Sequence, residues 1–173
     1  MKRILFVVGS LRKESFNRKL AMLAEEMIGR RAVVEYLDYS DLPMMNPDLE
    51  SSVPGSVTRV RGVVGEADGL WIFSPEYNHS YPGHLKNLID WLSRPVFPGD
   101  SATPLVINGK KVALSGAGGS GATIRCREKL TELLALPFIK ADVMKVPQTG
   151  IVLNPEAWTR GVMQLENGQT EAL

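Results

Sequence analysis

Residues 9–17, with the sequence GSLRKESFN, carry polar side chains suited to holding an anion, and they directly follow the apolar run ILFVV. A buried strand that leads through a polar loop into a helix brings free backbone N–H groups to the positive end of the helix dipole. Ser10, Ser15 and Asn17 can add side-chain donors there, and Arg12 can offer a bidentate fork. Each hydrogen bond to a charged group contributes about 1.5–3 kcal/mol, so a few of them would hold a phosphate monoester without a metal.

This loop differs from three other loops that handle phosphate. It lacks the terminal Gly-Lys-Ser/Thr of a Walker A loop, and Gly9 is its single glycine where the dinucleotide fingerprint needs three. It also contains no cysteine that could act as the nucleophile of a phosphatase. The pattern therefore favours a loop that holds a phosphate over one that cleaves it, with a capped surface turn as the plainer alternative.

A second polar stretch, SPEYNHSYPG at residues 74–83, follows another apolar run. Its two prolines stiffen the backbone, and a bend is expected at Ser80 or Gly83. A rigid loop of this kind can present N–H and C=O groups to the polar edge of a planar heterocycle. Tyr77 and Tyr81 would supply aromatic faces beside it.

A third stretch, SGAGGSGA, contains Gly116-x-Gly118-x-x-Gly121, a formal match to the dinucleotide fingerprint. The acidic residue expected at the end of the next strand is missing, because that run ends in MKVP and Asp142 stands at its start. Glycines here can instead let the backbone approach a flat ligand closely. Ser115 could add a hydroxyl to the same site.

The hydrophobic pattern around these stretches alternates between short apolar runs and helical spacing, which predicts strands and helices in turn. The predicted strands cover residues 3–9, 32–38, 69–75, 110–116 and 141–147; the predicted helices cover 15–29, 54–66, 83–93 and 122–136, with a last helix from Pro155 that frays after Gly168. We expect one α/β domain over residues 1–173, a flavodoxin-like three-layer sandwich with a five-stranded parallel sheet in the order 2-1-3-4-5. Ligands of such sheets bind at the carboxyl ends of the strands, where the three polar stretches fall.

The composition is that of an ordinary globular protein, with 20 Lys and Arg against 19 Asp and Glu. This balance gives no basic patch for a nucleic acid, and no apolar run approaches the roughly 20 residues that span a membrane. Cys126 cannot form an internal disulfide, so we expect a packed cysteine in a cytoplasmic protein. The spacing of His79 and His84 fits no zinc pattern, so no metal site is predicted.

Together, GSLRKESFNRKLA and SPEYNHSYPGHLKNLIDWLSRP resemble the NADPH-dependent FMN reductase family, whose flavodoxin-like members include chromate- and quinone-reducing enzymes. The resemblance covers about residues 3–135. It implies that the first loop holds the FMN phosphate, that the second borders the isoalloxazine chiefly through backbone groups, and that the third lies near the far side of the ring. The implied cofactor-binding residues are Ser10, Arg12, Ser15 and Asn17, then Pro75, Glu76, Tyr77 and Asn78, and finally Ser115, Gly116 and Gly118.

The resemblance implies an oxidoreductase that passes electrons from NADPH or NADH through FMN to a small acceptor, such as a quinone, free flavin, an azo compound, chromate or a ferric chelate. No catalytic side chain is assigned, because the cofactor performs the chemistry. Arg125, Arg127 and His79 are candidates for stabilising the reduced flavin, although we expect all three on the surface. The alternative function is a flavodoxin-type electron carrier, which does not oxidise NAD(P)H directly; such carriers are typically strongly acidic, and this chain is not.

The resemblance also implies a homodimer or homotetramer in which a neighbour helps to wall the flavin site. Trp91 and Pro95 fall off or beyond the apolar stripe of the predicted helix over 83–93. We expect them to be exposed beside Trp71, Tyr77 and Tyr81, where aromatic side chains would suit a subunit interface. In the helix over 122–136, the residues expected to face inward are Ile124, Leu130, Leu133 and Leu134.

Overall fold

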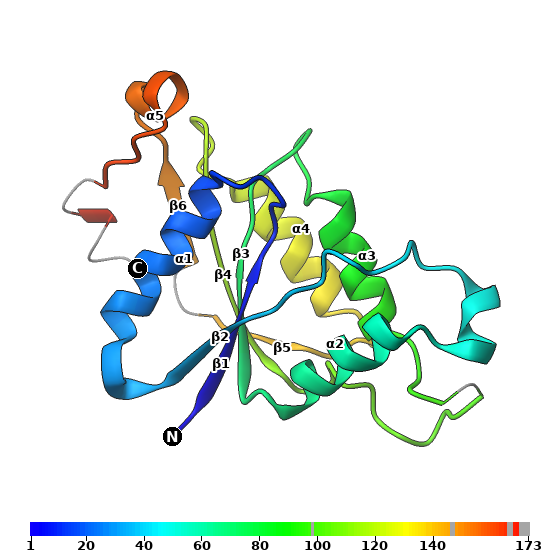
Figure 1. Ribbon diagram of the computed structural model, residues 1–173. Coiled ribbons are helices and arrows are strands. Elements are labelled where there is room, and N and C mark those ends of the chain that lie inside the picture. Colours follow the sequence, from blue (N-terminus) through cyan, green and yellow to red (C-terminus); the bar gives the residue numbers. More distant parts are fainter. Residues whose placement is uncertain (98, 146–147, 166–167, 170–173) are drawn as a thin grey trace.

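The computed structural model describes residues 1–97, 99–145, 148–165 and 168–169 (Figure 1). A parallel sheet runs through its centre with the strand order β2-β1-β3-β4-β5, which confirms the predicted flavodoxin-like order. The strands are β1 (Arg3–Val8), β2 (Val33–Tyr36), β3 (Gly69–Phe73), β4 (Lys111–Gly118), β5 (Asp142–Val143) and β6 (Thr149–Val152).

Two short strands share the edge beside β4, where the sequence predicted one strand over residues 141–147. β5 pairs with the start of β4 at Lys111 and Val112, and β6 pairs with its end from Ser115 to Gly118. Residues 146 and 147 of the predicted strand lie outside the described residues. Strand β6 was not predicted because its four residues, TGIV, include a glycine, which is depleted in strands.

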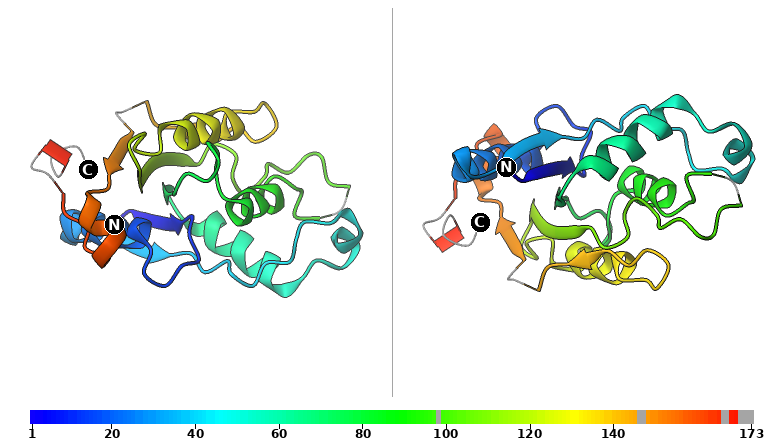
Figure 2. Two further views of the ribbon diagram at one scale, coloured as in Figure 1. Left: turned by 90° about the horizontal axis from the view of Figure 1, so that it is seen from above. Right: turned by 90° about the horizontal axis from the view of Figure 1, so that it is seen from below.

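Helices cover both faces of the sheet and make a three-layer sandwich (Figures 1 and 2). One face packs against α1 and α5, and the other against α2, α3 and α4. The helices are α1 (Phe16–Ile28), α2 (Gly55–Glu66), α3 (Gly83–Leu92), α4 (Ile124–Leu134) and α5 (Pro155–Arg160); two 3-10 turns, η1 (Gly29–Arg31) and η2 (Pro47–Ser52), flank β2. Helix α5 begins at Pro155 as predicted but ends at Arg160, short of the predicted end near Gly168, because Gly161 follows it in the left-handed region.

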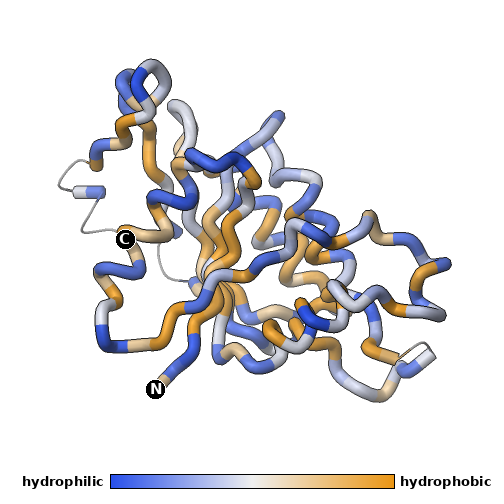
Figure 3. The backbone as a smooth tube through the Cα atoms, viewed as in Figure 1, coloured by the Kyte–Doolittle hydropathy of each residue, from blue (hydrophilic) through white to orange (hydrophobic). Residues whose placement is uncertain are grey.

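The strands form the apolar centre of the molecule, as the hydropathy colouring shows (Figure 3). Successive residues of β1 point to opposite faces, so Leu5 joins the cluster under α2, α3 and α4 while Phe6 joins the cluster under α1. A strand covered on both faces must be apolar at every position. This is why continuous runs, without alternation, identified the strands.

Two sequence predictions about helix faces are wrong. Trp91 is fully buried: its Nε1 donates to the carbonyl oxygen of Pro43 at 2.9 Å, because the segment after β2 crosses that side of α3. Trp91 is therefore not available to a subunit interface. Ile124 does not face inward and is 49% exposed, because it opens α4 ahead of the turn that contacts the sheet.

None of the helices in the described part of the chain has the length and apolar character needed to cross a membrane.

Candidate functional site

The three polar loops meet at the carboxyl edge of the sheet, at the top of Figure 1. The first loop, residues 9–15, follows β1; the second, residues 74–82, follows β3; the third, residues 119–123, follows β4. Strands β1, β3 and β4 are neighbours in the sheet, so their loops are neighbours as well. The base of the first loop is fixed to β3 because Gly9 N donates to Phe73 O at 2.8 Å.

In the first loop, Ser15 is the N-cap of α1, as its sequence position predicted. Its backbone is extended, and its Oγ accepts a hydrogen bond from Arg18 N at 3.3 Å. Ser10 Oγ accepts from Arg12 N at 3.4 Å, and both serine side chains are buried. Each hydroxyl accepts one bond and keeps its own hydrogen free to donate, since no acceptor for it lies among the described residues.

Asn17 lies in the first turn of α1 and is held by the sheet. Its Nδ2 donates to Ala117 O at 3.1 Å, and its Oδ1 accepts from Ala117 N at 2.9 Å. The side-chain oxygen and one amide hydrogen are thus used within the fold. The groups left for a ligand are the second amide hydrogen and the backbone N–H of Asn17, which belongs to the unpartnered first turn of α1.

Cationic and aromatic side chains lie beside the first loop. Arg12 is exposed and its Cζ lies 5.4 Å from the centroid of the Phe16 ring, while Lys19 Nζ lies 5.7 Å from it. Trp158 of α5 meets the same ring edge-on at 6.1 Å. The guanidinium of Arg12 has no carboxylate partner among the described residues, so its charge is available to an anion at the loop.

The second loop is built around a tight turn from Tyr77 to Ser80. The two residues exchange backbone hydrogen bonds of 2.9 and 3.0 Å. The bend is made by Asn78 and His79, with φ of 51° and 58°, and not by Ser80 or Gly83 as the sequence suggested. Positive φ at both central positions is the signature of a type I′ turn, and asparagine tolerates it well. The turn leaves the Tyr77 ring 51% exposed at the edge of the site.

Glu76 points away from the solvent and connects two loops. Its Oε2 accepts from Cys126 N at 3.0 Å, in the first turn of α4, and its Oε1 lies 3.3 Å from His79 Nδ1. Pro75, just before it, is buried and accepts a hydrogen bond from Ser74 Oγ at 2.9 Å. The Glu76 side chain is therefore used inside the protein, which leaves the backbone of this loop as the part that can face a ligand.

Near the end of β4, the residues predicted to contact the cofactor mainly bond to or pack against other parts of the protein. Ser115 Oγ accepts from Trp71 Nε1 at 3.0 Å. A Cβ on Gly116 would lie 2.3 Å from both Ser74 O and Thr123 Oγ1, and one on Gly118 would lie 2.8 Å from Thr123 Cγ2. These two glycines make room for Thr123, a residue that the sequence analysis did not single out.

Thr123 is unusual in two respects. Its φ is 60°, a rare conformation for a β-branched residue, and Ala122 before it also has a positive φ of 44°. Its Oγ1 is buried and has no hydrogen-bond partner among the described residues. No local sequence signal marks this residue, because its conformation depends on the glycines of β4 beneath it.

Arg127 is also buried, contrary to the expected surface position. Its Nη1 donates to Gln148 O at 2.7 Å and its Nη2 to Ala122 O at 3.2 Å, which ties the third loop to the approach to β6. Burial lowers the pKa of Arg127. Cys126 beside it is packed, as expected; its Sγ lies 3.3 Å from Ser74 Oγ, and burial raises the pKa of its thiol to about 11.

His84 follows the second loop, in the first turn of α3. Its ring stacks on Tyr39 at 5.9 Å, and the Tyr39 hydroxyl donates to Val8 O at the end of β1. Burial lowers the pKa of His84, so the ring is neutral at pH 7. Its Nε2 is a second buried atom at this edge without a partner among the described residues.

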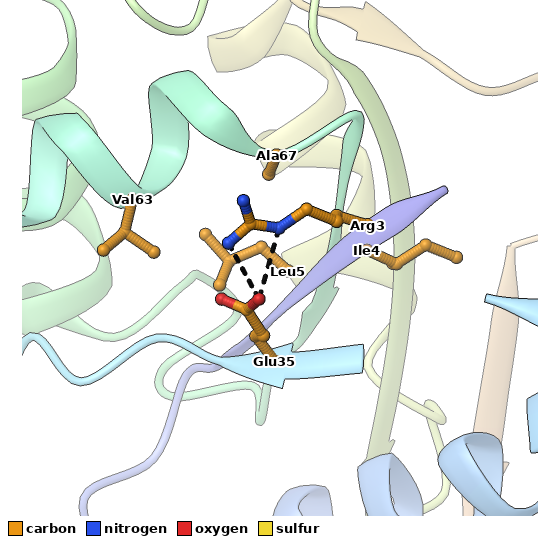
Figure 4. A pocket seen from close by; sticks show the side chains of 6 residues that line it. All are labelled: Arg3, Ile4, Leu5, Glu35, Val63 and Ala67. Carbon is orange, nitrogen blue, oxygen red and sulfur yellow. Dashed lines mark hydrogen bonds and ion pairs between the residues drawn. The ribbon is translucent and has the colours of Figure 1, made fainter. Parts of the chain in front are cut away.

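A pocket at the opposite, amino-terminal edge of the sheet is unsuited to a large ligand (Figure 4). Its empty space of about 160 Å³ is below the 300–1,000 Å³ that is typical of small-molecule sites. Arg3 and Glu35, which line it, bond to each other at 2.8 Å. The carboxyl edge of the sheet carries hydrogen-bond donors that have no acceptor among the described residues, and it is therefore the candidate site.

Comparisons with known proteins agree with this fold. A family model described as NADPH-dependent FMN reductase matches residues 2–154. A 2-hydroxy-1,4-benzoquinone reductase from Burkholderia sp is 33% identical, with 94% of this chain and 90% of that protein covered. An NAD(P)H:quinone oxidoreductase from Solanum tuberosum is 41% identical, covering 76% and 68%. The structure of a flavoenzyme NAD(P)H:(acceptor) oxidoreductase from Paracoccus denitrificans superposes with a TM-score of 0.83 at 31% identity, covering 99% and 91%.

Proposed function

The chain belongs to the NADPH-dependent FMN reductase family, and from that membership we propose that it passes electrons from NAD(P)H through bound FMN to quinones. The observation that carries the proposal is the first loop. Two buried serine hydroxyls, the free N–H groups of the first turn of α1 and Arg12 converge there, and within the described residues neither the hydroxyl hydrogens nor the guanidinium have a hydrogen-bond partner. This is the donor set that a phosphate monoester requires.

The residues at the carboxyl edge fit FMN at its other end as well. The second loop is a rigid turn whose side chains of Pro75 and Glu76 are packed inward, so its backbone is free to face a ring. The third loop lies across from it over the glycines of β4, with the buried Oγ1 of Thr123, which has no partner in the described part of the chain, beneath. Groups suited to a phosphate and a backbone suited to a flat ring therefore lie along one edge of the sheet, which supports the proposal.

In this proposal each loop binds a different part of FMN. Ser10, Ser15 and Arg12 hold the phosphate together with the backbone N–H groups of Phe16 and Asn17. The backbone of residues 75–78 faces the isoalloxazine from one side, and residues 115–118 support it from the other. Ser115 and Asn17 act chiefly through their backbones and their neighbours, because their side chains already bond to Trp71 and Ala117.

The chemistry that FMN supplies when bound is the transfer of two electrons from NAD(P)H to an acceptor. The chain contributes position and electrostatics. Arg127 places a buried positive charge at the third loop, since it bonds to carbonyl oxygens and to no carboxylate in the described part of the chain. Tyr77 adds an exposed aromatic face beside the site, on which a planar acceptor can rest.

Quinones are proposed as the acceptors because relatives with about a third or more of their residues identical are named as quinone reductases. Free flavin, azo compounds, chromate and ferric chelates are weaker acceptors in this proposal. Chromate and ferric chelates can take electrons from an exposed reduced flavin without a specific contact, whereas a planar quinone can stack on an aromatic side chain.

The test is a visible spectrum of the protein loaded with FMN and titrated anaerobically with NADPH, followed by a panel of acceptors. We expect stoichiometric bleaching of the flavin band and a kcat/KM for 1,4-benzoquinone at least about tenfold above that for chromate or an azo dye. A bound flavin that NADPH leaves oxidised would indicate an electron carrier instead. Failure to bind flavin would refute the function.

The proposal includes a homodimer or homotetramer. Exposed apolar side chains beyond the end of α3 support it: Phe97 is 67% exposed and Val96 is 36% exposed. Sedimentation at micromolar concentration should show a dimer or a tetramer, and a monomer alone would contradict association.

A further inference from the structure

The N-terminus of α4 lacks a cap of its own. An N-cap residue normally has an extended backbone, and its side chain accepts from the N–H two or three positions further on. Thr123 occupies the cap position with left-handed dihedral angles and makes no such bond. The N–H group that it would have capped, on Cys126, donates to Glu76 of the second loop.

The carboxylate of Glu76 is well suited to take the place of the missing helix cap. Its Oε2 lies 3.0 Å from Cys126 N, and a negative charge at the start of a helix is favoured by the helix dipole. The other oxygen, Oε1, lies 3.3 Å from His79 Nδ1 in the tight turn of the second loop. The side chain is 18% exposed, so little of it is open to solvent.

A second contact joins the same two segments. Cys126 Sγ lies 3.3 Å from Ser74 Oγ, two residues before Glu76. Cys126 thus meets the second loop through its backbone and through its side chain. The second loop and the start of α4, 50 residues apart in sequence, are held in register at this point.

We propose that Glu76 is a positioning residue that sets the second loop against the start of α4, and that this setting creates the site for the isoalloxazine ring. The inference rests on the proposed function, and it assigns to Glu76 a role through Cys126 and not through contact with the cofactor. The length of the side chain matters in this role, because the acceptor oxygen must reach Cys126 N. The charge adds to this contact through the helix dipole, but the hydrogen bond itself does not require it.

Two conservative substitutions separate length from charge. Glu76→Gln keeps the length and an acceptor oxygen but removes the charge; Glu76→Asp keeps the charge and is one methylene shorter. We would measure the Kd values of FMN and of riboflavin, which lacks the phosphate, by flavin fluorescence with the full chain freed of cofactor. Glu132→Ala, an exposed glutamate on α4, is the matched control.

Glu76→Gln should bind both flavins within about threefold of the wild type, and Glu76→Asp should bind both about tenfold more weakly, the size of a lost helix cap. Hydrogen exchange at the Cys126 amide should accelerate in Glu76→Asp alone. The reverse order, with Gln weak and Asp normal, would overturn the inference in favour of a direct charge effect. Equal flavin affinity in all variants would overturn it too and leave the function standing. A wild-type protein that binds neither flavin would refute the function itself, and the inference with it.

Discussion

Replacing Gly116 by alanine should destabilise the protein, because the added methyl group has no room. It would lie 2.3 Å from Ser74 O and 2.3 Å from Thr123 Oγ1. The carbonyl of Ser74 cannot move away easily, since Ser74 N is bonded to Ser115 O at 2.9 Å and continues the pairing of β3 with β4. Overpacking costs about 1–3 kcal/mol, and two close contacts, one of them with the backbone, place this substitution near 3 kcal/mol.

Urea denaturation would measure the free energy of unfolding, with Gly119→Ala as the control. Gly119 lies three residues further along, and its added methyl would meet no heavy atom within 4 Å. We expect Gly119→Ala to stay within about 0.5 kcal/mol of the wild type. For a chain of this size, Gly116→Ala should lower Tm by about 6–12 °C.

The double substitution Gly116→Ala/Thr123→Ala tests which contact is responsible. It removes Thr123 Oγ1 and leaves Ser74 O in place, so it should recover part of the loss and not all of it. If Gly116→Ala were as stable as Gly119→Ala, the packing of Thr123 against β4 would be wrong, and the glycine would have to be explained by a ligand.

Three further substitutions test the first loop and the start of α4. Ser15→Ala should lower the free energy of unfolding by about 1 kcal/mol, because the helix loses its cap. It should also raise the Kd of FMN at least about tenfold and leave the Kd of riboflavin unchanged. Equal losses of affinity for both ligands would argue against a phosphate contact. Asn17→Ala should lower the free energy of unfolding, measured by urea denaturation, by about 2–4 kcal/mol, because the buried N–H and C=O of Ala117 lose their hydrogen-bond partners. A loss under about 1 kcal/mol would mean that water replaces the side chain. Burial raises the pKa of Cys126 from about 9 to about 11, so its contribution to stability is complete below pH 9 and is lost as the pH rises to 11. Wild-type stability should therefore fall more steeply over that range than that of Cys126→Ala, and parallel pH profiles would show that the thiol does not titrate in this way.

Much of the fold could be predicted from local pattern. A strand covered on both faces must be continuously apolar, and a helix on a sheet must show helical spacing, so β1, β3 and β4 and the helices between them were identified from the sequence. Their alternation predicted the strand order, and the strand order predicted which loops meet. The N-cap at Ser15 was also predictable, because a cap acts within three residues.

Residues whose partners are distant in sequence, and elements whose pattern is weak, could not be predicted. Trp91 looked exposed on its helix, but the chain after β2 covers it. β6 is a strand because β4 extends to Gly118 and offers it a partner, although its own residues have weak strand character. Arg127 was expected on the surface, but it is buried and its guanidinium donates to the backbone carbonyl oxygens of Gln148 and Ala122.

The sequence by itself determined the α/β class, the strand order and the place of three polar loops, because these follow from burial patterns repeated every few residues. Only the tertiary structure decided what each predicted site residue touches. Asn17 bonds to Ala117, 100 residues away, and Glu76 bonds to Cys126, 50 residues away. Such contacts depend on how loops from different strands meet at one edge of the sheet, and no local pattern encodes the orientation of one loop relative to another.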